Sequence, residues 1–585
     1  METLHSIRDY SPFSARSNSP TTSDETGFYA AEVNYTYRQH RLANDTDAFE
    51  HRNQPMPYSL LPTEAEVVFA RLFHSVGAAQ ILCYFLFPAI TAWLLIGVFL
   101  QLDASLPLAA LLALLTLVAS FSLRTLDNGA RDLLAHGLHS GFIETLPASR
   151  NPNPNMTFPL FLGALLALIA ALRRRSNGFA LLAGVLGGLL FYSYVFYAIA
   201  CSAAVAVLVL VALLRGRTST RPASAGPTLV GPSLVALLVT ICMAVPFLLW
   251  VRAAKRAGGY FYRMNRMGMV YSHLPSPQEL KLSAVYGSVL LLLWILWRYV
   301  LPKSRSAGDR GRSFAGSAVL VFGCAVAGGI LGMNMQLVSG FNLQAESHFP
   351  HMILQPAMVL LCLVISLAAT VKIREKRSAL WAAALFLIFF AVCASVQVEA
   401  AVNSAPLHRV DPSQQALFHW LNRNTQRGDV VATTSLELTF DMPVFSQDYT
   451  LMVEGSRTSA SNSEILERYL LAEALTGTPA ATVTDELGSG KLIYPSRQSS
   501  TYPAFFFEHS PDLAGPGTVN PSVLEKSLAE YRTLDPALEL KRFRVNYLYT
   551  ENGQTPTKIA GVSWQKVLET PEGSLWRLNR VQPAH

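Results

Sequence analysis

The chain has 585 residues, of which 51% are hydrophobic and only 15% are charged, and its mean hydropathy is +0.30. Soluble domains carry about a quarter charged residues, so this composition excludes an ordinary soluble protein. The net charge of +7 and the pI near 9.0 do not indicate a nucleic-acid partner, because the basic residues lie mostly in short loops between apolar runs.

Residues 1–75 are polar, carry more acids than bases and contain no signal-peptide core. Within them, residues 29–41 are predicted to form a surface-lying helix. The amphipathic residues 63–73 are predicted to form a second helix that leads into the membrane, and Thr63 and Glu66 have the spacing of a capping box.

Between about residues 76 and 402 the sequence consists of long apolar runs, and a helix needs about 20 apolar residues to cross a hydrocarbon core. We therefore predict an all-α polytopic membrane bundle of about ten transmembrane helices over residues 76–402, followed by a soluble C-terminal α/β domain over residues 403–585. The predicted spans are 76–101, 104–123, 157–172, 178–195, 196–214, 230–251, 282–301, 315–337, 353–371 and 379–401.

The fourth and fifth spans meet in an aromatic stretch, Phe191-Tyr-Ser-Tyr-Val-Phe-Tyr197, which is typical of a turn at a membrane interface. One long tilted helix through this stretch is the alternative. All six cysteines lie in predicted spans without the spacing of a metal site, and we interpret them as small apolar core residues.

Short loops rich in Lys and Arg set the orientation, since positive charge accumulates on the cytoplasmic side. If the ten spans alternate, the basic loops at 173–175, 215–221, 303–312 and 372–377 all fall on one side, which is then cytoplasmic. Residues 1–75, the loops at 124–156, 252–281 and 338–352, and the C-terminal domain share the extracytoplasmic side.

Two features of that outer side are anomalous. Residues 252–266 contain five cations and no acid: Arg252, Lys255, Arg256, Arg263 and Arg266. Either a helix is miscounted, or this cluster binds an anionic group such as a lipid phosphate. Nothing in the chain explains how the polar N-terminus is translocated. We expect a first helix upstream of Met1, and direct translocation of the tail is the alternative.

The outer segment before the bundle resembles the GT-C superfamily of membrane glycosyltransferases, which includes dolichyl-phosphate-mannose-protein mannosyltransferases and the aminoarabinose transferases of lipid A. In that superfamily an acidic pair opens the first outer loop, and here Asp24-Glu25-Thr-Gly-Phe-Tyr29 stands in the matching place. Two further short stretches resemble bacterial polysaccharide-assembly relatives: Arg150-Asn-Pro-Asn-Pro154, and Asn334-Met-Gln336 with Gln344 and His348.

The resemblance implies an inverting glycosyltransferase of a bacterial inner membrane. It would use a polyprenyl-phosphate-linked sugar and a glycan, lipid or protein acceptor of the cell envelope. Asp24 or Glu25 is the candidate general base, and the 252–266 cluster is the candidate for holding the leaving phosphate. His348 could hydrogen-bond a phosphate or sugar and Arg150 could face a phosphate, although each could instead be structural.

No nucleotide or redox cofactor is expected, because the sequence contains no Walker A loop and no GxGxxG motif that opens a helix after a strand. HExxH and EF-hand patterns are absent as well. No residue is assigned to a metal, although a divalent ion remains open. The predicted helix interiors hold almost no charge, which argues against an ion-coupled transporter. A non-catalytic component of polysaccharide assembly or export and a lipid or glycan transporter are the alternatives to the enzyme.

The C-terminal domain is predicted to contain helices at 413–424 and 463–474 and a buried strand at 429–433. Strands are also predicted at 505–507 and 545–549, and a strand pair at 564–577. The sequence of this domain contains no recognisable catalytic constellation. Acceptor binding and structural support are therefore the two interpretations of the role of the domain.

Overall fold

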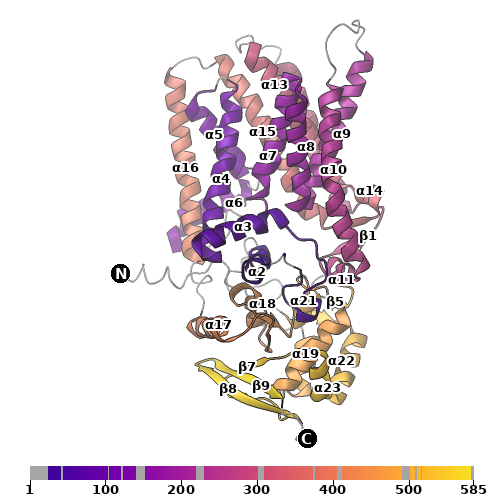
Figure 1. Ribbon diagram of the computed structural model, residues 1–585. Helices are drawn as coiled ribbons and strands as arrows, with labels where there is room; N and C mark the ends of the chain where they lie inside the picture. Colours follow the sequence, from indigo (N-terminus) through magenta and orange to yellow (C-terminus); the bar gives the residue numbers. More distant parts are fainter. Residues whose placement is uncertain are drawn as a thin grey trace.

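The structure is a computed structural model that describes residues 24–40, 42, 44–102, 104–119, 123–139, 152–218, 229–300, 309–372, 376–404, 411–489, 501–507, 510–515 and 517–580. The long helices stand side by side in a bundle, and the C-terminal domain lies beyond one end of it (Figure 1). We call this end of the bundle the domain end and the opposite end the far end. Three shorter helices lie between the two parts: α2 (Asp24–Gln39), α3 (Leu60–Phe73) and α11 (Gly259–Arg266).

Each of the ten predicted spans coincides with a helix over most of its described residues. Among the described residues, eight helices are long and apolar enough to cross a membrane, and two apolar helices, α5 and α8, are shorter. The bundle helices are α4 (Val76–Leu100), α5 (Leu106–Ala119), α7 (Thr157–Arg174), α8 (Asn177–Leu189), α9 (Val195–Thr218), α10 (Val230–Arg256), α12 (Pro277–Val300), α13 (Asp309–Met333), α15 (Ala345–Lys372) and α16 (Lys376–Ser404). The protein is therefore a polytopic helical membrane protein, as its apolar runs predict.

The aromatic stretch between α8 and α9 is a turn. Leu190–Tyr192 form a short 3-10 helix, and α9 begins afresh at Val195. The Ser193 hydroxyl lies 2.8 Å from the hydroxyl of Thr157, at the start of α7, which ties the turn to the neighbouring helix. The prediction of two helices rather than one long helix is confirmed.

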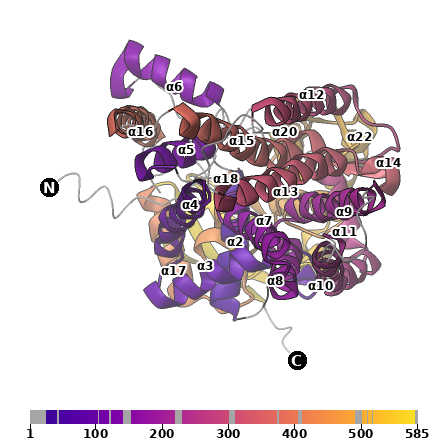
Figure 2. The same ribbon diagram turned by 90° about the horizontal axis from the view of Figure 1, so that it is seen from above.

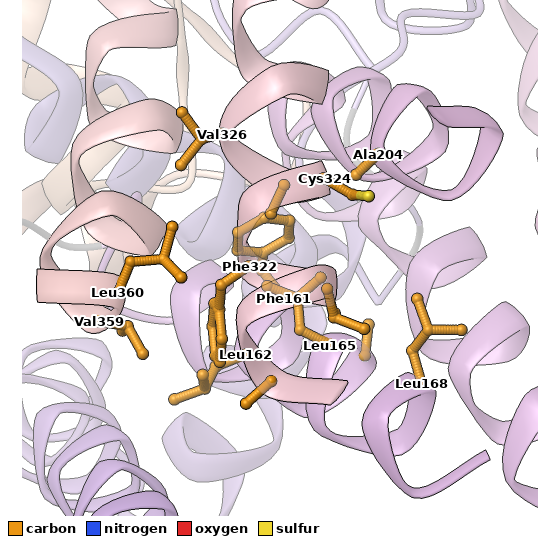
Figure 3. Packing of buried hydrophobic residues seen from close by; sticks show 14 of the residues in the cluster. Phe161, Leu162, Leu165, Leu168, Ala204, Phe322, Cys324, Val326, Val359 and Leu360 are labelled. Atoms are coloured by element: carbon orange, nitrogen blue, oxygen red, sulfur yellow. The ribbon is translucent and has the colours of Figure 1, made fainter. Parts of the chain in front are cut away.

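Helix α7 forms the centre of the bundle. In its apolar window 67% of the residues are buried, compared with 11% for α16 at the edge. Phe161, Leu162 and Leu165 of α7 pack against Phe322 of α13 and Leu360 of α15 (Figure 3). On the outside of α16 lies the amphipathic α6 (Leu123–His136), which is the outermost helix in Figure 2. Helices such as α16 and α12 therefore present most of their apolar surface to lipid.

The described parts of the outer segments predicted to share one side lie at the domain end. Asn34 of α2 donates its amide to the carbonyl oxygens of Pro443 and Ser446, at 2.9 and 2.7 Å. Strand β1 (Met269–Tyr271) pairs antiparallel with β2 (Phe341–Leu343), which follows the short α14 (Gln336–Ser339). Arg173 and Arg174 end α7 at the far end. This separation agrees with alternating spans, while the side of the membrane on which each end lies stays a prediction.

The C-terminal domain is an α/β fold around a five-stranded sheet of order β4-β3-β7-β9-β8, in which β4, β3 and β7 are parallel. Strands β7 and β9 and strands β9 and β8 pair antiparallel. The sheet strands are β3 (Val430–Ala432), β4 (Tyr449–Thr450), β7 (Tyr547–Glu551), β8 (Val562–Thr570) and β9 (Gly573–Arg580), and a separate small hairpin is made by β5 (Leu513–Gly515) and β6 (Thr518–Val519). The domain helices are α17 (Pro412–Asn424), α18 (Leu436–Phe445), α19 (Asn462–Thr476), α20 (Ala480–Gly488), α21 (Tyr502–Phe507), α22 (Pro521–Thr533) and α23 (Pro536–Arg542).

Two local predictions are wrong. Residues 505–507 form part of helix α21 rather than a strand, and the Thr501 hydroxyl caps its first turn by accepting from the backbone N–H of Ala504. Helix α3 begins at Leu60, so Thr63 and Glu66 lie inside it and do not form a capping box. A reciprocal box exists instead at Ser276 and Glu279, where each side chain accepts from the other residue's backbone N–H.

Residues 24–75 share a core with the C-terminal domain. Tyr35, Ala48 and Tyr58 pack in the same apolar cluster as Tyr449 and Leu451. The buried carboxylate of Asp45 accepts from the backbone N–H of Ser459 at 2.7 Å and from the hydroxyl of Thr458 at 2.7 Å. These two parts of the chain, more than 400 residues apart, form one extramembrane unit.

A buried acid in this unit makes its stability depend on pH. Glu473 of α19 is 1% exposed, and its burial, together with the nearby charge of Glu486, raises its pKa to about 8. Tyr469 donates to the half-buried Glu486 at 2.5 Å, so this phenol and a second carboxyl group lie near Glu473. Because the folded state holds a proton that the unfolded chain releases near its ordinary pKa, stability is complete below that value and falls as the pH rises toward 8.

Glu473→Gln is therefore expected to flatten the loss of stability between pH 5 and pH 8. At pH 8 the variant should be about 2 kcal/mol more stable than the wild type, because glutamine carries no charge to bury. Thermal unfolding of the full chain across this range measures the effect. Glu525→Gln changes an exposed acid on α22 and should leave the profile unchanged. A wild-type profile that does not fall with rising pH would contradict the prediction.

Candidate functional site

Helix α2 carries the predicted acidic pair to the domain end of the bundle. Asp24 and Glu25 form the first turn of α2, and their side chains lie outside the described residues. One turn later, the hydroxyl of Tyr29 accepts from the amide of Asn153, at 3.3 Å, just before α7. Positions 25, 29 and 32 have the i, i+4, i+7 spacing of a single helix face. The contact of Tyr29 with Asn153 therefore joins α2 to the loop before α7.

Glu32, two turns into α2, was not a candidate from the sequence. Its side chain is 6% exposed, and Nη2 of Arg263 lies 4.0 Å from its Oε1. Burial raises the pKa of Glu32 to about 7, and the positive charge of Arg263 opposes that rise. A buried carboxyl group with a pKa near neutrality can accept a proton at physiological pH. No sequence signal marks it, because its cationic partner lies 231 positions away (263 − 32).

The basic cluster of residues 252–266 divides into two groups. Arg263 and Arg266, on α11, are buried at 3% and 0% exposure, whereas Arg252, Lys255 and Arg256 at the end of α10 are exposed. Arg266 donates to the carbonyl oxygens of Gly455, Thr458 and Ala460 and to the side chain of Asn462, at distances of 2.7 to 3.0 Å. These contacts favour a structural role for Arg266 over the phosphate contact that the sequence suggested.

Arg263 has a similar environment. Its Nε donates to the carbonyl oxygen of Ser456 at 2.7 Å, and its Nη1 donates to the carbonyl oxygen of Pro57 at 3.4 Å. It therefore joins the N-terminal segment, α11 and the C-terminal domain at one point, beside Glu32. Both arginines of α11 hold the extramembrane unit against the bundle.

The exposed cations follow an apolar stretch of α10 that is long enough to cross a membrane. From Val230 to Trp250, α10 runs for 21 apolar or small polar residues, which cover about 30 Å at 1.5 Å per residue. Arg252, Lys255 and Arg256 follow directly. The Lys255 ammonium lies 5.4 Å from the ring of Phe341, on β2. Cations in this position can meet a lipid-borne phosphate.

His348 lies near the start of α15 and faces the turn between α8 and α9. Its Nδ1 is 2.6 Å from the hydroxyl of Tyr194, and its ring stacks on Phe196 with centroids 4.3 Å apart. Deeper in the bundle the hydroxyl of Tyr197 donates to Gln355, at 2.5 Å. Tyrosines of the predicted aromatic turn thus fix polar side chains of α15. His348 is half-buried.

The two stretches that resemble polysaccharide-assembly proteins organise the loops of the domain end. Arg150 lies outside the described residues, but Asn155 donates to the backbone carbonyl of Cys83 at 3.3 Å, which joins this loop to α4. Gln336 donates to the buried Glu279 at 2.7 Å, and Asn342 contacts the same carboxylate. These polar residues link α4, α7, α12 and the β1–β2 pair.

The structure brings some predicted residues together and separates others. Arg263 meets α2 through Glu32, and the Asn-Pro-Asn-Pro loop meets α2 through Tyr29. His348 contacts the α8–α9 turn, and Arg252, Lys255 and Arg256 lie at the end of α10. Among the described residues, no group of three His, Cys, Asp or Glu side chains is arranged to hold a metal ion.

Comparisons with known proteins give structural likeness alone. No protein-family model and no curated protein matches the sequence. The structure is similar to ArnT from Cupriavidus metallidurans bound to undecaprenyl phosphate, with 14% identity and a TM-score of 0.39, over 77% of this chain and 84% of that one. It is also similar to the apo state of ArnT, with 13% identity and a TM-score of 0.41, over 84% and 90%.

Proposed function

We propose that the protein is a glycosyltransferase that moves a sugar from a polyprenyl-phosphate donor to a cell-envelope acceptor at the extracytoplasmic face of a bacterial inner membrane. One observation carries the proposal: a helix that opens with an acidic pair is anchored, through Tyr29 and Glu32, beside polar and cationic residues at the domain end of a membrane bundle. A reaction between a phosphate carried by a lipid and an acceptor that arrives from water must take place where lipid and water meet, which is at an end of the bundle.

The proton acceptor is a carboxylate on the bundle-facing side of α2. Asp24 and Glu25 are the first candidates, from the resemblance of the sequence to the GT-C superfamily. Glu32 is a third, because its pKa near 7 suits a general base at neutral pH. It shares a helix face with position 25.

The reaction is a displacement at the anomeric carbon. An acceptor hydroxyl oxygen forms the new glycosidic bond while its proton passes to the carboxylate. The bond between the anomeric carbon and the phosphate oxygen breaks, and its electron pair stays on the phosphate. Direct attack of this kind inverts the anomeric configuration. No nucleotide is consumed, because the phosphate of the lipid is the leaving group.

The donor requires cations and an apolar tail site. Arg252, Lys255 and Arg256 are proposed to stabilise the phosphate, since they are exposed directly after the apolar stretch of α10. His348, and Arg150 outside the described residues, are proposed as further polar contacts. An apolar cavity of about 750 Å³ between α9, α12, α13 and α15 offers room for part of a tail, and Gly287, Gly316 and Gly323 leave open space along it.

The test is transfer by the purified full chain in lipid nanodiscs. Polyprenyl phosphates carrying a radiolabelled hexose, pentose or amino sugar are offered with an envelope-glycan and lipid extract, and both the new glycoside and the released polyprenyl phosphate are measured. Asp24→Asn with Glu25→Gln is expected to reduce the rate by about 10²- to 10⁴-fold if the pair contains the base. The single variants and Glu32→Gln identify which carboxylate acts.

Asp127→Asn is the matched control, because Asp127 is an exposed acid of α6 that pairs with Arg131. It should retain the wild-type rate. Undiminished transfer by the variants of α2 would refute the assignment of the base. Binding of the donor without any new glycosidic bond would instead favour a non-catalytic membrane component, and movement of the lipid between leaflets would favour a transporter.

A further inference from the structure

A second apolar groove lies on the outside of the bundle, toward the far end. It encloses about 470 Å³ between α4, α7 and the start of α13, which are neighbours in Figure 2. Leu94, Val98 and Ile169 are among its lining residues. A Cβ atom at Gly97 would meet no atom within 4 Å, so there is open space beside this glycine. A volume of this size is within the range of small-molecule sites.

One end of the groove is polar. Gln101 and Arg173 also line it, and Arg173 is the one charged residue among the described residues that do so. The guanidinium carbon of Arg173 lies 5.2 Å from the ring centre of Phe314, which also lines the groove. Arg174 and Arg175 follow directly and are exposed. The groove therefore has an apolar body and a cationic end.

The depth of the groove matches a lipid in one leaflet. Helix α4 starts at the domain end with Val76 and reaches Leu100 after 25 residues, which is about 37 Å and spans a hydrocarbon core. Gln101 and Arg173 consequently lie at the headgroup level of the far leaflet, with the apolar lining below them. Trp93, 75% exposed, marks the lipid-facing opening, eight positions before Gln101.

We propose that this groove binds an anionic phospholipid of the far leaflet, with an acyl chain against Gly97 and the phosphate on Arg173. Charge complementarity selects an anionic headgroup, because a zwitterionic lipid adds its own cation beside the arginines. The bound lipid would bridge α4, α7 and α13. The site is separate from the proposed chemistry, which lies at the domain end, and it does not depend on the proposed function.

The experiment uses the full chain in vesicles of phosphatidylcholine with or without phosphatidylglycerol, followed by native mass spectrometry and thermal unfolding. We expect the wild type to retain phosphatidylglycerol at least tenfold over phosphatidylcholine and to unfold at a higher temperature with it. Arg173→Gln should lose this preference because the cation is removed. Gly97→Leu should lose retention because the side chain fills the groove.

Arg71→Gln is the control, since Arg71 is an exposed cation on α3 at the other end of the bundle. It should behave as the wild type. A photo-crosslinking residue at Trp93 should capture a phosphatidylglycerol probe, which tests occupancy in a chain with Gly97 unchanged. Equal retention of both lipids by the wild type would overturn the proposal. So would retention by Gly97→Leu, because the lipid would then be held at the surface alone.

Discussion

Replacing Arg266 by alanine is expected to lower the free energy of unfolding by roughly 4 kcal/mol or more and to loosen the extramembrane unit from the bundle. The guanidinium is 0% exposed and donates to three carbonyl oxygens and one side-chain oxygen of residues 455–462. Alanine leaves those carbonyls buried without their donor, and each such group costs about 1–3 kcal/mol. The loss falls on residues 455–462 of the C-terminal domain, which Arg266 holds against α11.

Thermal unfolding of the full chain in detergent, followed by tryptophan fluorescence, measures the stability loss, and limited proteolysis follows release of the domain. Arg256→Ala removes an exposed arginine ten positions earlier, so it should change stability by no more than about 0.5 kcal/mol. Arg266→Lys keeps the charge, but one ammonium cannot reach all four acceptors, and an intermediate stability is expected. Equal stability of the two alanine variants would show that the buried contacts contribute nothing.

Gly455→Ala tests the same loop from its other side. A methyl carbon at Gly455 would lie 2.7 Å from the carbonyl carbon of Phe506 and 3.1 Å from Cδ of Arg266. The loop must move to admit it, and the carbonyl that Arg266 binds moves with it. A similar loss of stability and similar proteolysis are expected. A stable Gly455→Ala variant would show that the loop shifts without weakening the junction.

The membrane bundle was predictable because the hydrocarbon core imposes one demand on sequence. Each span must satisfy its own backbone within an apolar helix, so runs of about 20 apolar residues locate the helices without knowledge of their packing. The aromatic turn at 191–197 was predictable for the related reason that aromatic side chains favour the interface. Helices α5 and α8 are shorter than the spans predicted for them, so apolar runs predict the position of a helix better than its length.

The roles of charged residues were less predictable. Arg256 and Arg266 belong to the same basic stretch, yet one is exposed and the other is buried among carbonyl groups contributed by residues about 190 positions later. The spacing of Arg263 and Arg266 places both on one face of α11, which was a signal for a shared environment. The spacing could not show whether the two arginines bind a phosphate or protein carbonyl groups. Glu32 was not predicted as a site residue for the same reason, since its raised pKa depends on burial by residues distant in the sequence.

Short apolar runs were ambiguous. A strand was predicted at Phe505 to Phe507 because three aromatic residues are too few to show whether the period is that of a helix or of a strand. The hydroxyl of Thr501 decides the outcome by capping a helix that begins at Tyr502. Thr63 and Glu66 had the spacing of a capping box, but Ser59 precedes the first turn of α3 and the box falls inside the helix. In both cases the residue that directly precedes the helix, Thr501 or Ser59, lies before the residues on which the prediction was based.

A second large effect is expected in the bundle, where Gly328→Ala should lower the free energy of unfolding by about 3 kcal/mol. A methyl carbon at Gly328, on α13, would lie 2.5 Å from the carbonyl oxygen of Ala200 and 2.7 Å from Cα of Ala204, both on α9. These atoms are backbone, so no side chain can rotate away. The two helices must separate, and the contacts of Phe322 and Val326 with the rest of the core weaken with them.

Gly323→Ala, on the same helix five positions earlier, is the matched control, because nothing lies within 4 Å of a methyl carbon there. It should be neutral, or stabilising by up to about 1 kcal/mol through the higher helix propensity of alanine. Unfolding of both variants in detergent by increasing SDS measures the difference. If Gly328→Ala proves as stable as Gly323→Ala, α9 and α13 are free to slide, and close approach through small residues is not what holds them. If only Gly328→Ala is destabilised, the stability of the bundle depends on the absence of a single methyl group at this crossing.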